Sequence, residues 1–199
     1  NEQLTAAGAN LKRVAIADFG GLRGVMALED LAKGDEIVSI PGPCAVNLGS
    51  QSIDPVAAAV ALLEASERDA ASGRRQAYWG LLPSLEAADL CTPDYFTEAE
   101  MAMLQWPPVE EEVRLRKEAM DEALAAAPQL MADASAEERR RKLRWATFLV
   151  LSRVLTVQGP AGPMGGASKL LIPFLDMFNH HAATKHYLTG RTPPRRELC

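Results

Sequence analysis

The sequence predicts a mixed α+β fold, and three observations support this. Short segments rich in β-branched and apolar residues, separated by glycines, fill the region from Arg13 to Pro41. Helix-start signals and an alanine-rich stretch follow from Asp54 onward. A short apolar segment, Lys169 to Ile172, then follows a loop rich in glycine and proline. This order is typical of an α+β fold, so a parallel sheet of alternating βαβ units is not expected.

The first part of the chain is expected to be a compact β unit. Its strands are predicted at residues 13–16, 24–28 and 36–40, whose sequences are RVAI, GVMAL and EIVSI. Glycines punctuate these segments, as expected of tight turns between short strands. They are Gly20, Gly21, Gly24 and Gly34.

Capping signals predict where helices begin. Asp54 precedes Pro55, an order in which aspartate caps a helix and proline takes its first position. This helix is expected to run to about Ala71. A second helix is expected after Thr97, because Thr97 and Glu100 have the spacing of a capping box.

A third helix is expected after Ser135, which forms a second capping-box pattern with Glu138. Its front is basic from Arg139 to Arg144, which indicates a solvated helix face more than a nucleic-acid site because Glu137 and Glu138 lie beside it. Its second half is expected to be buried, because apolar residues recur there at helical spacing. They are Leu143, Thr147, Val150, Leu151 and Val154.

The composition is that of an ordinary globular domain. Of the 199 residues, 48% are hydrophobic and 24% are charged, with a formal net charge of -5. Overall charge is therefore not expected to hold the protein on nucleic acid or on an anionic membrane. No apolar segment reaches the roughly 20 residues that span a bilayer. We expect a soluble monomer with no nucleic-acid or membrane partner.

Cysteine usage bears on the cellular compartment. Cys44, Cys91 and Cys199 are too few and too scattered for a disulfide framework, and none forms a CxxC pair. A reducing intracellular compartment is expected, with cytoplasm, nucleus and plastid all left open. The sequence begins with Asn1, so a targeting segment ahead of it would not be visible.

The most informative segment is LIPFLDMFNHH, residues 171–181. It places Asp176, Asn179 and His180 directly after an apolar strand. Buried carboxylate, amide and imidazole groups are costly unless they are hydrogen-bonded. These groups therefore form an internal network or meet a polar ligand, and the residue types alone favour the internal network.

This segment resembles the strand-and-loop motif of SET-domain methyltransferases, which reads LIP, a small residue and D-M-x-N-H. Four further stretches resemble, in order and spacing, the branch of the Rubisco large-subunit lysine methyltransferase and the actin histidine methyltransferase. They are GGLRGVMALEDLAKGDEIVSIP from Gly20, YWGLLPS from Tyr78, DYFTEAEMAMLQ from Asp94 and WATFLVLSRVL from Trp145. The resemblance spans nearly all of residues 10–188.

The resemblance implies a SET-domain β-fold of small curled sheets with a large helical insertion. Residues 10–50 would form the N-terminal part of the SET domain, 51–145 the helical insertion and 146–199 the C-terminal part. The family's catalytic tyrosine lies in a Y-G stretch near the end of the domain, and Tyr187 does not lie in a matching context. The resemblance thus implies a domain that is incomplete at the C-terminus, Cys199, and a chain that is inactive alone.

The resemblance also implies a site for S-adenosyl-L-methionine. At Gly21, Leu22 and Arg23 the glycine-rich opening would let the backbone approach the methionine part of the cofactor, although a glycine-rich turn alone indicates a simple hairpin. The Asn179 side chain would meet the cofactor's amino group, and the His180 backbone would recognise the adenine edge. Further residues would brace or contact this pocket. They are Ser152, Arg153 and Asp176.

The predicted function is that of an S-adenosylmethionine-dependent protein-lysine N-methyltransferase of SET type, with a protein substrate as partner. Two alternatives stay open, a catalytically inactive SET-derived interaction module and a protein-histidine N-methyltransferase. A zinc site at His180, His181 and His186 is not expected, because adjacent histidines point apart on a strand and no HExxH helix is present. No metal is therefore predicted.

Overall fold

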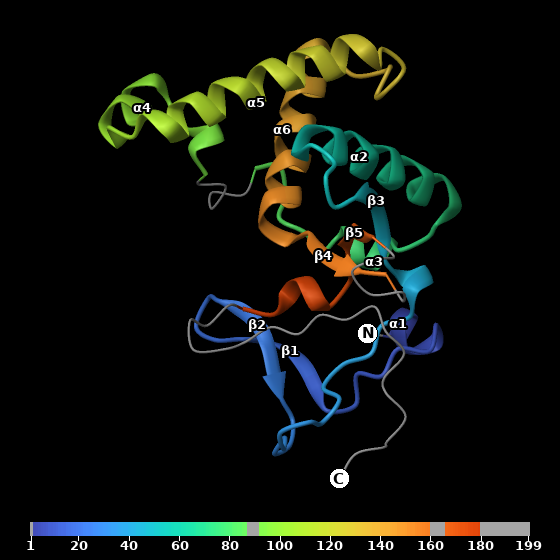
Figure 1. Cartoon of the computed structure of the whole chain (residues 1–199). Helices are drawn as coiled ribbons and strands as arrows, with labels where there is room; N and C mark the ends of the chain where they lie inside the picture. Colours follow the sequence, from blue (N-terminus) through green and yellow to red (C-terminus); the bar gives the residue numbers. More distant parts are fainter. Residues whose placement is uncertain (1, 87–91, 160–165, 180–199) are drawn as a thin grey trace. The chain divides into compact units, whose positions relative to one another are not determined.

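The structure is a computed structural model of the 199-residue chain. It describes residues 2–86, 92–159 and 166–179. Helices and small antiparallel sheets make up the described part (Figure 1), which confirms the α+β prediction. The chain divides into two compact units. Unit 1 consists of Asn1–Ser52 and Arg153–Cys199, and unit 2 consists of Ile53–Ser152.

The described part of unit 1 contains two small sheets. The first is the antiparallel hairpin of β1 (Val14–Asp18) and β2 (Arg23–Ala27). The second has the order β3-β5-β4 and is also antiparallel. Its central strand is β5 (Ala167–Leu171), which pairs with β3 (Val46–Ser50) and β4 (Leu155–Gln158). Three short helices, α1 (Glu2–Ala6), η1 (Gly42–Cys44) and η4 (Leu175–Met177), complete its described part.

Residues 36–40 do not form the strand that was predicted for them. A single bridge joins Asn10 to Ser39, in which the two N–H groups donate across at 2.9 and 3.1 Å. Val38 and Ile40 pack on a buried hydrophobic cluster of unit 1. The cluster consists of Ala9, Leu11, Val14 and Phe174. The β-branched residues of 36–40 therefore suit a half-buried segment, which does not require a ladder of strand hydrogen bonds.

Strand β4 was not predicted, because the apolar pattern of the preceding helix was extended to Val154. Residues 155–158 instead pair with β5, and the hairpin closes where Gly159 N–H donates to the Gly166 carbonyl at 2.9 Å. Four residues are too few to show a strand period, so the partner strand decides their conformation. The strand predicted at 169–172 is confirmed as β5, which begins two residues earlier, at Ala167.

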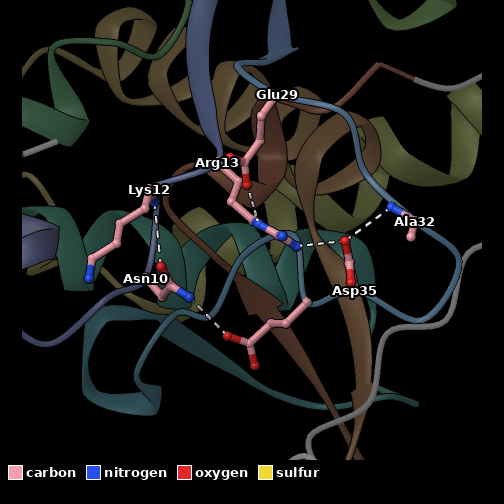
Figure 2. Close-up of polar contacts among 7 residues, drawn as sticks. Asn10, Lys12, Arg13, Glu29, Ala32 and Asp35 are labelled. Atoms are coloured by element: carbon pink, nitrogen blue, oxygen red, sulfur yellow. Dashed lines mark hydrogen bonds and ion pairs between the residues drawn. The ribbon is translucent and has the colours of Figure 1, made fainter.

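An exposed polar network holds the loop after β2 (Figure 2). Arg13, next to the start of β1, pairs with Glu29 at 2.5 Å and with Asp35 at 2.8 Å. Asp35 also accepts the Ala32 N–H at 3.0 Å, so its carboxylate closes a turn of the loop. Hydrogen bonds from Arg13 to Asp35 and then Glu29 raise the pKa of the guanidinium. The network ties this loop to the β1–β2 hairpin.

Unit 2 is helical (Figure 1). Its main helices are α2 (Pro55–Ser72), α5 (Pro107–Ala126) and α6 (Ala136–Arg153), the last of which ends at the start of the second segment of unit 1. The shorter helices are α3 (Gln76–Trp79), η2 (Pro93–Tyr95) and α4 (Glu98–Leu104). The three helix starts predicted from capping signals are confirmed.

The capping groups lie where the sequence places them. Asp54 Oδ1 accepts the N–H groups of Val56 and Ala57 at 2.7 and 3.3 Å. Thr97 and Glu100 form the reciprocal capping box. Ser135 Oγ accepts the N–H of Glu138 at 3.2 Å. These bonds satisfy first-turn N–H groups that have no partner inside the helix.

The buried stripe of α6 is largely as predicted. Leu143, Thr147 and Val150 are buried, and they lie on one face at helical spacing. Leu151 was wrongly placed in this stripe, since it is 45% exposed. Val154 lies after the end of the helix and is half-buried. The face of α6 is completed by Ala146 and Leu149, which are fully buried.

Arginines in the basic front of α6 contact other helices of unit 2. Arg139 Nη2 donates to the carbonyls of Leu124 and Ala127 at 3.2 and 2.8 Å, where it satisfies the C-terminal end of α5. The Arg144 guanidinium lies 4.5 Å from the centre of the Tyr95 ring. These arginines therefore stabilise the packing of unit 2.

Candidate ligand-binding site

Residues 19–22 form the turn between β1 and β2. Gly20 and Gly21 have φ values of +76° and +93°, and a type I′ hairpin turn needs positive φ at both positions. Phe19 N–H donates to the Leu22 carbonyl at 2.8 Å, and Gly21 N–H donates to Asp18 Oδ1 at 2.7 Å. The glycine-rich opening is thus a hairpin turn, with Gly21 and the 60% exposed Leu22 at its tip.

The backbone of this turn is open to a ligand. A Cβ built on Gly20 or Gly21 would meet no described heavy atom within 4 Å. Their positive φ values nevertheless disfavour any side chain. Both glycines are therefore needed for the conformation of the turn, and its outer face is accessible.

Asn179 lies directly against strand β2. Its Nδ2 donates to the carbonyl of Arg23 at 3.3 Å, which joins residues 156 positions apart. A Cβ on Gly24 would lie 2.5 Å from this Nδ2 and 3.2 Å from Cε2 of Phe19. Only glycine at position 24 leaves the amide where it is. Because Nδ2 donates to Arg23, the amide oxygen of Asn179 is the atom suited to accept a hydrogen bond from a ligand.

Gly24 was missed as a site residue, because sequence reasoning treated it as a turn glycine. It lies inside β2, opposite Ala17. A glycine inside a strand often marks the close approach of another group, and this signal was available.

Arg153 and Asp176 form an ion pair within unit 1. The Asp176 side chain is 0% exposed and that of Arg153 is 19% exposed. Arg153 Nη1 lies 3.3 Å from both Asp176 Oδ2 and the Asp176 carbonyl oxygen, and 3.7 Å from the Met177 sulfur. A buried carboxylate needs such compensation for the loss of water. Arg153 therefore holds the η4 segment within unit 1.

The backbone before η4 adopts a rare conformation. Phe174 has φ +74° and ψ -45°, which is unfavourable for a residue with a large side chain. Its ring is buried and meets the Phe178 ring edge-on, with centroids 6.3 Å apart. Packing thus holds a strained turn that leads to Asp176 and Asn179. Backbone strain of this kind clusters at functional sites.

The structure brings some predicted site residues together. Arg23 meets Asn179, and Arg153 meets Asp176, all within unit 1. Ser152 belongs to unit 2, and its hydroxyl donates to the Phe148 carbonyl one helical turn earlier, at 2.7 Å.

Other candidates fall outside the described residues. His180 is one of them, as are His181, His186 and Tyr187. Within the described part of the chain, no three histidine, cysteine, aspartate or glutamate side chains are grouped to hold a metal ion. None of the described helices is long and apolar enough to cross a membrane.

Solved SET-domain structures share this fold. The SET domain of LSMT bound to MeLysine and AdoHcy matches with a TM-score of 0.67 and 18% identity, over 94% of this chain and 45% of that chain. The SET domain of LSMT bound to Lysine and AdoHcy matches with a TM-score of 0.67 and 18% identity, over 93% of this chain and 43% of that chain. Rubisco LSMT bound to AdoMet matches with a TM-score of 0.65 and 18% identity, over 92% of this chain and 44% of that chain.

The present chain therefore spans less than half the length of these proteins. No protein-family model matches the sequence, and no curated protein matches it.

Proposed function

We propose that this chain, which has the SET-domain fold, binds S-adenosyl-L-methionine and belongs to a protein-lysine N-methyltransferase. The observation that carries the proposal is the position of Asn179, whose amide lies against Gly24 and is held by the Arg23 carbonyl. The similar SET domains were crystallised with AdoHcy or AdoMet, which supports the choice of ligand.

The residues present fit the methionine end of this cofactor. That end carries an ammonium group, and the Asn179 amide oxygen is suited to accept one of its hydrogens. The open backbone at Gly20 and Gly21 permits close approach of a chain-like ligand. Arg153 and Asp176 would position Asn179 without touching the ligand, because their ion pair holds the η4 segment that precedes Asn179.

When bound, the cofactor supplies an electrophilic methyl group on a sulfonium, which a neutral amine nitrogen can accept. The chain's own contribution would be alignment of the ligand on the hairpin turn. Lysine is proposed as the acceptor in preference to histidine because two of the similar structures contain lysine or methyllysine.

Binding of S-adenosylhomocysteine and S-adenosylmethionine, measured by isothermal titration calorimetry, tests the site. Asn179→Ala removes the proposed hydrogen bond, and Gly24→Ala displaces the amide. Each is expected to weaken binding about tenfold or more. Gly42→Ala is the matched control, because a Cβ there meets no described atom within 4 Å. A folded wild-type chain that binds neither ligand would contradict the proposal.

The acceptor is tested separately with isotopically labelled S-adenosylmethionine and a mixture of proteins. Label recovered as methyllysine after hydrolysis supports the lysine assignment, whereas methylhistidine contradicts it. Because the resemblance implies that the chain is inactive alone, binding of the cofactor without transfer of label agrees with that expectation, and only recovered label decides between lysine and histidine.

A further inference from the structure

The junction of α4 and α5 in unit 2 displays apolar side chains to solvent. Helix α4 contains no buried residue. Met103 is 80% exposed, Trp106 is 58% exposed and Leu104 is 37% exposed. Single exposed apolar residues are common, but three within four positions, including a tryptophan, indicate an interaction site. We name Met103, Leu104 and Trp106 the α4–α5 apolar patch.

The backbone holds this patch in a defined conformation. Gln105 has φ +50°, a left-handed value that is uncommon for a residue with a side chain. Trp106 occupies the N-cap position of α5, and its carbonyl accepts the N–H of Val109 at 3.0 Å. Pro107 takes the first position of α5 and restricts the turn further. Preorganisation of this kind lowers the entropy lost when a partner binds.

The surroundings of the patch are acidic. Residues 92–113 include six acidic residues and no lysine or arginine. Three of the acids, Asp94, Glu111 and Glu112, pair with arginines 114 and 116 of α5. The other three are exposed and lie on α4 and the first turn of α5. They are Glu98, Glu100 and Glu110.

We propose that the α4–α5 apolar patch binds a basic amphipathic segment of a partner protein. Apolar side chains of that segment would cover Met103 and Trp106, since methionine adapts to irregular surfaces and tryptophan often dominates binding energy. Its lysines or arginines would face Glu98 and Glu110, and opposite charges speed association and exclude acidic partners.

A second copy of this chain fits the patch less well. A symmetric dimer would place the same surface of each copy against the other. Glu98, Glu100 and Glu110 would then face like charges, which is unfavourable. The proposal is independent of cofactor binding, because every residue that it uses belongs to unit 2 and none lies in the candidate ligand-binding site.

Fluorescence anisotropy with three short labelled peptides tests this inference on the full chain. The first has leucine and lysine at helical spacing, the second replaces lysine by glutamate, and the third replaces leucine by serine. We expect binding of the leucine–lysine peptide, which weakens as salt is raised, and much weaker binding of the other two.

Variants locate the binding surface. Trp106→Ser is expected to lower the affinity for the leucine–lysine peptide about tenfold or more. The double variant Glu98→Lys, Glu110→Lys is expected to lower this affinity further. Leu151→Ser is the matched control, because Leu151 is similarly exposed in unit 2 but lies on the last turn of α6. Circular dichroism checks that each variant is folded.

Three results would overturn the inference. The first is equal binding of the leucine–glutamate peptide, and the second is an equal loss of affinity in Trp106→Ser and Leu151→Ser. The third is a dimer in sedimentation velocity that Trp106→Ser dissociates, because the patch would then be covered by a second copy.

Discussion

Asp69 in unit 2 and Asp176 in unit 1 are both buried carboxylates that face an arginine, yet their surroundings differ. Asp69 accepts from Arg75 Nε at 2.6 Å and from Arg75 Nη2 at 2.9 Å, and Trp79 Nε1 adds a third bond at 2.9 Å. Burial raises the pKa of Asp69, but the hydrogen bonds from Arg75 and then Trp79 outweigh it and hold the pKa below its ordinary value.

The Asp176 pair is looser and less local. Arg153 lies 3.3 Å from the carboxylate and divides its Nη1 between the side chain and the carbonyl of the same residue. The two partners are 23 positions apart, whereas Asp69 and Arg75 are six apart. The tight local pair thus stabilises the end of a helix. The longer pair holds a strained segment beside Asn179, so we assign it to the candidate site.

The largest expected effect tests the stabilising role of Asp69. Asp69→Ala leaves the half-buried Arg75 guanidinium without its carboxylate and should lower the free energy of unfolding by about 3 kcal/mol. Urea denaturation measures this, and Glu67→Ala, at an exposed position of the same helix, should change stability by less than about 0.5 kcal/mol. Equal effects of the two substitutions would remove the contrast with Asp176.

The pH dependence of stability sharpens the same contrast. Because the folded-state pKa of Asp69 is lowered, the ionised form stabilises the fold fully above its ordinary pKa of about 4. This contribution is lost as pH falls through the lowered folded-state pKa. The stability difference between wild type and Asp69→Asn should therefore shrink on acidification below about pH 4. A stability difference between the two proteins that grows on acidification would contradict the lowered pKa of Asp69.

Arg153→Lys tests whether the Asp176 pair serves binding more than stability. Lysine keeps the charge but lacks the planar guanidinium, whose Nη1 lies 3.3 Å from both the Oδ2 atom and the backbone carbonyl oxygen of Asp176. Affinity for S-adenosylhomocysteine should fall about tenfold, with a stability loss near 1 kcal/mol. Arg140→Lys, at an exposed position, is the control for the same exchange. A large stability loss with unchanged affinity would make this pair equivalent to that of Asp69.

Thr97→Ala is expected to have the smallest effect. It removes the capping box of α4, which should cost about 1 kcal/mol. Hydrogen exchange should show faster opening of α4 without a change in affinity for the cofactor. Thr156→Ala, on the exposed face of β4, should leave α4 unaffected. Slower exchange in α4 would contradict this prediction.

Local interactions explain which parts of the fold were predictable. The helix starts at Asp54, Thr97 and Ser135 depend on side chains that bond to N–H groups two or three residues away. Residues 36–40 were mistaken for a strand because β-branched residues suit a half-buried segment and do not reveal whether a partner strand is present. Strand β4 was missed for the converse reason, since its partner β5 defines it.

The candidate site divides in the same way. The positive φ values of Gly20 and Gly21 follow from their residue type and their central place in the hairpin turn. The amino-acid sequence alone thus indicates the hairpin turn, the capped helices and the polar segment around Asp176, because each rests on groups close along the chain. Only the tertiary structure places Asn179 against Gly24 and Arg153 against Asp176. Asn179 bonds to Arg23, the neighbour of Gly24, which is 156 positions away, and Arg153 bonds to Asp176, which is 23 positions away. No local sequence pattern encodes contacts between residues so far apart in the chain.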